Sequence, residues 1–157
     1  MFRCLNRICS ATIVALFLAV PVPVLAGDDG VVTVKSAYSL AETTERLKKD
    51  IAGKGIKFFD EIDQAKLAAD AGIKLRPSIL LIFGNPPLGT QFITAKAVAG
   101  LDWPVRLLVF ENEKGEVWMA YSDFAWIAHR HGIDNRDEQF KIAALVFASI
   151  VSSAHAN

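Results

Sequence analysis

The chain has 157 residues, of which 52% are hydrophobic, and its 17 basic residues balance its 17 acidic residues. The apolar fraction is too high for an intrinsically disordered chain, and a formal net charge of zero provides no basic surface for nucleic acid. The length corresponds to one domain.

The first 26 residues have the pattern of a secretory signal peptide. Arg3 and Arg7 form a positive n-region, residues 10–20 form an apolar h-region, and residues 24–26 form a small-residue cleavage site. Two prolines interrupt the apolar stretch, which is shorter than the roughly 20 residues of a spanning helix. We therefore expect cleavage near Ala26, a periplasmic or secreted product and no stable membrane span; an uncleaved anchor is the alternative.

Cleavage at this position would also remove both cysteines, Cys4 and Cys9. The product would have 131 residues, with 15 basic and 17 acidic side chains and a net charge of −2. A chain without cysteine has no disulfide, no thiolate nucleophile and no Cys-ligated zinc or iron–sulfur cluster. Such a near-neutral surface does not favour polyanions, so nucleic acid is not an expected partner.

Hydrophobic periodicity and turn residues predict five strands with interspersed helices after a polar linker at residues 27–30. The expected strands are residues 31–34, 56–62, 75–83, 105–110 and 116–121. The expected helices begin at Ser39, with a capping box to Glu42, at about Asp63, at Thr90, at Phe124 after the cap Asp123, and at Asn135 or Asp137. Gly132 is expected to end the helix that begins at Phe124, and Gly115 to have positive φ in the hairpin turn between the last two strands. This order predicts a single α/β (α+β) domain, with a mixed five-stranded sheet that ends in an antiparallel hairpin and is flanked by helices.

The hydrophobic patterns of two of these segments predict which of their faces are buried. The run at residues 75–83 is apolar throughout, which indicates a strand buried on both faces. The segment Ile142–Val151 is apolar nearly all round, so the C-terminal region, residues 134–157, is expected to pack on the domain or on a partner. A homodimer through Ile142–Val151 is one such arrangement.

The loop Gly84–Thr90 is the first candidate binding site, because it lies between a buried strand and a helix start. Backbone N–H groups converge at such a position in open α/β sheets. The loop has no phosphate-binding motif, and a rigid turn is the competing interpretation. Asn85 is its polar side chain.

The sequence His129-Arg130-His131 is the second candidate site. Two histidines at this spacing point to nearly opposite sides of a helix and do not chelate one metal from regular helix geometry. A favourable interaction with the helix dipole is the alternative for either of them. His131, next to Gly132, is the stronger functional candidate, and a metal site of His131 with a carboxylate such as Asp63 is a second possibility.

Acidic and aromatic side chains supply the remaining candidates. Each carboxylate, Asp102 included, is more simply explained as solvated or capping than as an acid–base catalyst. Aromatic residues around Tyr121 are expected in the core, and with Arg76 and Arg106 they are also suited to an apolar pocket with a few polar groups. No nucleophile motif is present.

The chain resembles the DUF302 family, a bacterial domain of unknown function that is often exported. The resemblance covers residues 31–133 and is carried by Ile62-Asp63-Gln64-Ala65, the string from Leu75-Arg76-Pro77 to Phe83-Gly84-Asn85-Pro86, Gly89-Thr90, Leu101-Asp102-Trp103-Pro104, Gly115-Glu116-Val117-Trp118 with Tyr121, and Arg130-His131-Gly132. It implies a compact α/β domain and no established activity. The family commonly has a histidine where this chain has Gln64, so a metal or haem site that used it with His131 would lack a ligand here.

These observations predict an exported, non-enzymatic domain that binds a small molecule through Arg76, Asn85, Gly89, Tyr121 and His131. A metal- or haem-dependent protein or enzyme using His131, and a self-associating module, are the alternatives. The sequence assigns no cofactor and no ligand.

Overall fold

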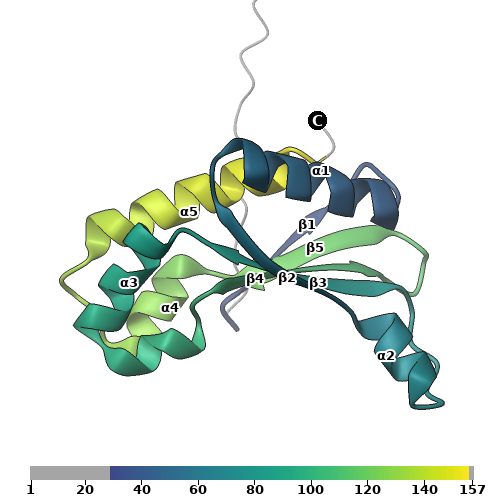
Figure 1. The fold of residues 1–157 in the computed structure, drawn as a ribbon, viewed down its shortest axis with the longest axis horizontal. Helices are drawn as coiled ribbons and strands as arrows, with labels where there is room; N and C mark the ends of the chain where they lie inside the picture. The colour runs from purple at the N-terminus through teal and green to yellow at the C-terminus, as the bar shows by residue number, and fades with distance from the viewer. Residues whose placement is uncertain (1–28, 156–157) are drawn as a thin grey trace, which may run out of the picture.

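Five strands in one sheet and five α-helices make up residues 29–155, the part of the chain that the computed structural model describes (Figure 1). In chain order the elements are β1 (Val31–Lys35), α1 (Leu40–Gly53), β2 (Lys57–Asp63), α2 (Gln64–Asp70), β3 (Ser78–Gly84), α3 (Pro86–Ala95), the 3₁₀ helix η1 (Ala97–Leu101), β4 (Val105–Glu111), β5 (Val117–Ser122), α4 (Phe124–His131) and α5 (Asp137–Ser152). The predicted class, one domain with a sheet and flanking helices, is confirmed. The predicted signal peptide lies outside the described residues.

The sheet has the strand order β1-β5-β4-β3-β2, and every neighbouring pair is antiparallel. The expectation of a mixed sheet was wrong. It rested on the alternation of strands and helices, which is typical of parallel crossovers. Here α2 and the α3–η1 segment lie at opposite ends of the sheet, and each returns the chain antiparallel to the strand it has just left (Figure 1). Among the described connections, α1 alone crosses a face of the sheet, from β1 at one edge to β2 at the other.

Two helices, α1 and α5, cover one face of the sheet (Figure 1). The predicted cap of α1 is confirmed, since the Ser39 side chain accepts a hydrogen bond from the Glu42 N–H at 3.3 Å. Leu47 and Ile51, one helical turn apart, are fully buried against the sheet. Amphipathic spacing therefore both defines α1 and fixes the face that it buries.

The C-terminal helix α5 packs on the rest of the domain, with contacts to α1, α3 and α4. Its buried residues follow helical spacing, and Phe147 is at their centre, with its ring 5.3 Å from that of Phe83 and 4.4 Å from that of Tyr121. Ile142 and Leu145 remain 49% and 71% exposed. The segment Ile142–Val151, apolar nearly all round, therefore has one face packed on the domain and one face exposed to solvent.

The strand β3 is buried on one face only, contrary to the expectation of burial on both. Leu81 and Phe83 are at most 1% exposed under the helices, whereas Leu80 and Ile82 on the opposite face are only half-buried. The run is apolar throughout because both faces of β3 carry large aliphatic side chains, although no described helix covers the second face (Figure 1).

The segment Gly84–Thr90 is not a loop before a helix, because Gly84 ends β3 and residues 86–90 already form the first turns of α3. Asn85 occupies the N-cap position, and two prolines occupy the first positions of the helix. Proline is tolerated there because the N–H that it lacks has no partner within the helix. The expectation that Thr90 begins the helix was wrong for this reason.

No helix within residues 29–155 is both long enough and apolar enough to cross a membrane.

Candidate functional site

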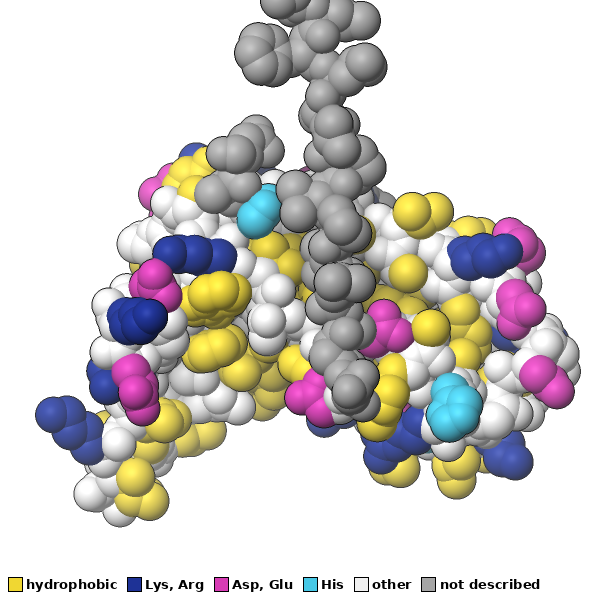
Figure 2. Space-filling view, turned by 180° about the vertical axis from the view of Figure 1, so that it is seen from behind, with side chains coloured by type: hydrophobic (Ala, Val, Ile, Leu, Met, Phe, Trp, Pro, Cys, Tyr) yellow, Lys and Arg dark blue, Asp and Glu magenta, His cyan; other side chains and the backbone are white. Residues whose placement is uncertain are grey.

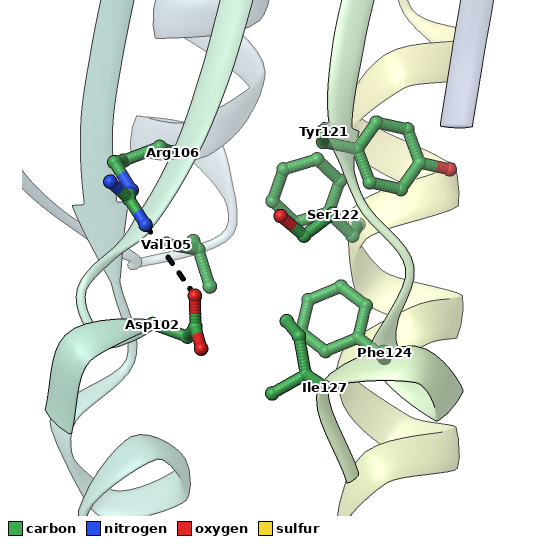
Figure 3. A pocket seen from close by; sticks show the side chains of 8 residues that line it. Asp102, Val105, Arg106, Tyr121, Ser122, Phe124 and Ile127 are labelled. Carbon is green, nitrogen blue, oxygen red and sulfur yellow. Dashed lines mark hydrogen bonds and ion pairs between the residues drawn. The ribbon is translucent and has the colours of Figure 1, made fainter. Parts of the chain in front are cut away.

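The strands β4 and β5 separate at one end of the sheet. Their ladder runs from Glu111 opposite Val117 to Leu108 opposite Ala120 and is not continued toward Arg106 and Ser122. Beyond this point β5 pairs only with β1, and a small pocket opens between the two strands. Figure 3 shows Arg106 and Asp102 on one side of the opening. Tyr121, Ser122, Phe124 and Ile127 lie on the other.

A buried carboxylate, Asp102, stands at this opening and is held by three cationic or ionisable side chains. Its side chain is 5% exposed, and its Oδ2 lies 2.6 Å from Nε2 of His131, whose side chain is equally buried. Arg130 donates to both carboxylate oxygens, at 3.3 and 3.1 Å. Arg106 approaches Oδ1 at 3.5 Å and also donates to the Leu101 carbonyl at 3.3 Å. A buried carboxylate requires such partners, because an unpaired charge is costly away from water.

Local sequence explains how these groups meet. Asp102 is the residue at which η1 ends, and its backbone N–H donates to the Ala99 carbonyl. Asp123 caps α4 by accepting from the Trp126 N–H at 2.7 Å, and Gly132 ends α4 in the left-handed conformation, with φ of 61°. The predicted bounds and caps of α4 are thereby confirmed. His131 and its neighbour are the last residues of α4, so both side chains reach the same carboxylate on η1.

Burial also affects Tyr121, which lines the pocket. Desolvation, with a smaller contribution from the negative charge of Asp123, raises the pKa of the Tyr121 phenol above its ordinary value of 10. The hydroxyl therefore stays protonated throughout the neutral range, and it points away from Asp102 and Arg106 (Figure 3).

The structure brings together two of the five predicted site residues. Tyr121 lines the pocket beside Asp102, and His131 contacts the same carboxylate. Arg76 is exposed before the start of β3, while Asn85 is exposed just after its end, so the length of the strand, about 20 Å, separates them. Asn85 makes no side-chain cap hydrogen bond.

The fifth residue, Gly89, is buried for a packing reason. A Cβ at this position would fall within the indole ring of Trp103, which also packs beside Phe92 at a centroid distance of 5.6 Å. Glycine is needed here because the indole approaches the helix backbone closely. Its recurrence in the family motif therefore has a structural explanation.

Asp63 and His131 do not meet. Asp63 lies opposite Ile79 at the far end of the sheet, where it caps α2 by accepting from the Lys66 N–H at 2.8 Å. His131 is engaged with Asp102 instead. Within residues 29–155 no group of three or more His, Cys, Asp or Glu side chains is arranged to hold a metal ion.

Sequence reasoning missed the central residue of the site. Asp102 was treated as one of several carboxylates with a solvated or capping role, but it is 8% exposed and has paired cationic neighbours. One feature of the sequence indicates that Asp102 has a cationic partner, since Arg106 follows it by four residues. The contacts from α4 come from residues 28 and 29 positions away and depend on the tertiary fold.

Fold and site together define a small α/β domain with a single antiparallel sheet and a buried Asp–His–Arg cluster at one end of it. The family model described as "Domain of unknown function DUF302" matches residues 32–148, well over half of the chain and extending into α5. The chain belongs to the DUF302 family, as the resemblance of its motifs predicted.

Known proteins of similar sequence and structure place the domain in context. The chain is 42% identical over 106 residues to "Fluoride-specific ion channel FluC 1" of Brucella suis biovar 1 (strain 1330), covering 68% of this chain and 42% of that protein. The chain is also 42% identical over 106 residues to "Fluoride-specific ion channel FluC 1" of Brucella abortus biovar 1 (strain 9-941). This match covers 68% of this chain and 39% of that protein. The chain thus spans about two fifths of these curated relatives.

A solved structure has the same fold. The crystal structure of an uncharacterized conserved DUF302 protein from Bacillus stearothermophilus matches with a TM-score of 0.73 and 16% sequence identity. The match covers 80% of this chain and 98% of that one.

Proposed function

We propose that this DUF302 domain is a non-enzymatic binding domain that takes a small anionic group, such as a carboxylate, between β4 and β5. The observation that carries the proposal is the state of Arg106 at the opening. Its side chain is 52% exposed, and the hydrogen bonds described for it use one guanidinium nitrogen, Nη2. A guanidinium has five N–H donors in a fixed fork, so most of those of Arg106 remain for a ligand.

The charge balance at the opening favours an anion. Asp102 already accepts from one Arg130 nitrogen, Nη1, at both of its oxygens and has a short contact with His131, so its negative charge is compensated without Arg106. The positive charge of Arg106 is then the charge that a ligand meets first. The Tyr121 ring lines the same pocket, but its hydroxyl points away from Arg106 (Figure 3), so Arg106 is the donor that faces the opening.

The size of the pocket limits the ligand. Its volume is about 20 Å³, whereas pockets for metabolites and cofactors usually measure about 300–1,000 Å³. Such a space holds about one water-sized group, so only the charged end of a ligand would enter it. Val105, Phe124 and Phe147 supply an apolar floor, which suits a short aliphatic carboxylate more than a strongly hydrated ion.

The geometry favours binding over catalysis. His131 is 5% exposed in its side chain and is engaged through Nε2 with Asp102, and no described hydroxyl contacts its other nitrogen. An activated serine requires a histidine within hydrogen-bond reach as its base. Ser122 lines the same pocket as Asp102 but makes no described contact with His131.

The test is a titration of the purified protein with sodium salts of acetate, propionate, chloride and fluoride, followed by amide NMR at constant ionic strength. Fluoride is included because the curated relatives are named fluoride-specific ion channels. We expect propionate to shift the amide signals of Arg106, Tyr121 and Ser122 saturably. A preference for fluoride over chloride and propionate would instead identify the ligand class as a small inorganic anion.

Two variants make the titration specific. Arg106→Gln should weaken binding at least tenfold. Arg46→Gln is the matched control, because Arg46 is also exposed and also paired with a carboxylate four residues away, but lies on α1. Equal binding by both variants, or no saturable shift with any of the four anions, would contradict the proposal.

A further inference from the structure

Apolar side chains line the side of the sheet away from α1 and α5, and no helix within residues 29–155 covers them. Register places Ile62, Leu80, Leu108 and Ala120 in one row across four strands, and Phe110 lies opposite Trp118 in the next row. We call these six residues, with Ile82, the open face. All of them are half-buried side chains that no described helix covers. Figure 2 shows hydrophobic side chains between the two ends of the molecule.

A projecting segment borders the open face at one end. Residues 64–77, which we call the α2 arm, comprise α2 and the chain that leads into β3, and none of these residues is buried. Leu67, Ile73 and Leu75 on this arm are 58%, 62% and 49% exposed. The arm is attached by its cap at Asp63, by a hydrogen bond of 2.7 Å from the Ser78 hydroxyl to Gln64, and by one of 3.0 Å from the Glu111 N–H to the Pro77 carbonyl.

The α2 arm buries no side chain of its own, so its leucines and isoleucine do not contribute to the core. Apolar surface of this kind on a small domain marks an interaction site, and here Asp60 and Arg106, which flank Ile82 on the same face, border it. Strand addition at the neighbouring edge is disfavoured, because β2 has a bulge at Phe59 and is bordered by charged side chains such as Asp60 and Glu61. The occupant therefore covers the face of the sheet and does not extend its edge.

We propose that the open face and the α2 arm form one interface with a second copy of this chain. The two features are complementary in chemistry, an apolar projection and an apolar sheet face, and every copy carries both. A twofold axis allows the arm of each copy to cover the open face of the other, which is the self-complementary arrangement of a closed dimer. A single contact then covers both exposed surfaces on both molecules.

The available area is sufficient for a stable dimer. Four strands spaced about 4.8 Å apart, with five residues of about 3.3 Å each, give an open face of roughly 300 Å² in projection. Side-chain relief raises the accessible area above this projection, and the fourteen residues of the arm add to it on each copy. The sum is on the order of the 800 Å² per partner that a standard stable interface buries.

The interface is tested by measuring the molar mass of the protein, purified from cells that express the full chain, over a range of concentrations. Sedimentation equilibrium should give a dimer. Leu67→Asp with Ile73→Asp should weaken association at least tenfold, because two charges would enter an apolar contact. These variants should fold, since both side chains are exposed. Ala120→Lys on the open face should have the same effect, because arm and face contact each other across the interface.

Leu145→Asp is the matched control. Leu145 is 71% exposed on α5, which lies on the other side of the sheet, and it belongs to the segment first considered for dimerisation. This variant should remain dimeric. The proposal is overturned if the wild-type protein is a monomer at every concentration, or if Leu145→Asp dissociates while the arm variant does not. Circular dichroism of each variant separates loss of association from loss of fold.

Discussion

The two ends of the sheet are built in different ways. At one end, Trp103 packs against Gly89 and Phe92 while Asp102 is buried among Arg106, Arg130 and His131, so α3, η1 and α4 are joined by packing and by charge. At the other end, the α2 arm has no buried residue and is attached by a helix cap, one side-chain hydrogen bond and one backbone hydrogen bond to Pro77. The first end is stabilised within the chain, and the second leaves apolar surface for something outside it.

The difference shows that helical sequence patterns do not report how firmly a helix is held. Both α2 and α4 begin with an aspartate cap and are followed by a glycine with positive φ. The helix α4 buries Phe124, Ile127 and His131, whereas α2 buries nothing. Packing against the rest of the fold, and not local propensity, determines which helix is rigid.

The largest effect on stability is expected from Gly89→Ala, at the end of the sheet where Trp103 packs on α3. We call this end the packed end. The added Cβ would overlap the Trp103 indole, which is fixed between the helix and Phe92, so we expect a loss of about 3 kcal/mol in the free energy of unfolding. Urea denaturation followed by Trp fluorescence measures it. Gly100→Ala is the control, because its Cβ would meet its nearest neighbour at 4.0 Å. Equal stability of the two variants would show that the packed end is looser than described.

The second effect tests the charge cluster at the same end. Asp102→Ala removes a carboxylate that is 5% exposed and leaves His131 and Arg130 without their shared partner. Breaking such a buried pair costs about 3–5 kcal/mol, and because Arg130 is 44% exposed and can turn to solvent we expect about 2 kcal/mol here. Asp134→Ala, at an exposed position, should change stability by less than about 0.5 kcal/mol. A small effect of Asp102→Ala in thermal unfolding would make the cluster dispensable for the fold.

Local rules predicted much of the fold from the sequence. The bounds of α4 follow from Asp123 and Gly132, and Gly115 has the positive φ expected in the β4–β5 hairpin. Each of these features depends on residues within a few positions of one another, where capping and turn chemistry act. Sequence patterns are therefore reliable where the physical cause is also local.

The strand order and the site could not be predicted in this way. Whether β3 pairs with a parallel or an antiparallel neighbour depends on where α2 and α3 pack, and the alternation of elements is compatible with both. The importance of Asp102 arises from contacts with residues 28 and 29 positions later. Arg76 and Asn85 share a family motif, but they flank the same strand and are separated by its length. Their proximity in the sequence predicts one shared site, but the fold places the two residues at opposite ends of β3.

The smallest effect concerns a second carboxylate, Glu116, which begins the return strand of the hairpin near the α2 end. Lys35, at 2.7 Å, and the Asn112 amide, at 2.8 Å, hold its pKa well below the usual 4.5, at about 2. The pKa is depressed in the folded state, so the contribution to stability is complete above about pH 4.5 and is lost as the pH falls toward 2. Because the pair is exposed to solvent, this contribution is small and salt-dependent, in contrast to that of Asp102.

Lys35→Met separates this weak contribution from the strong one at the other end of the sheet. An NMR titration of the Glu116 side-chain carboxyl should give a pKa of about 2 in the wild type and a value closer to 4.5 in the variant. The stability difference between the two proteins should be constant above pH 4.5 and should vanish toward pH 2. If Lys35→Met destabilised the protein as much as Asp102→Ala does, burial would not distinguish the two carboxylates, and the contrast between the ends of the sheet would fail.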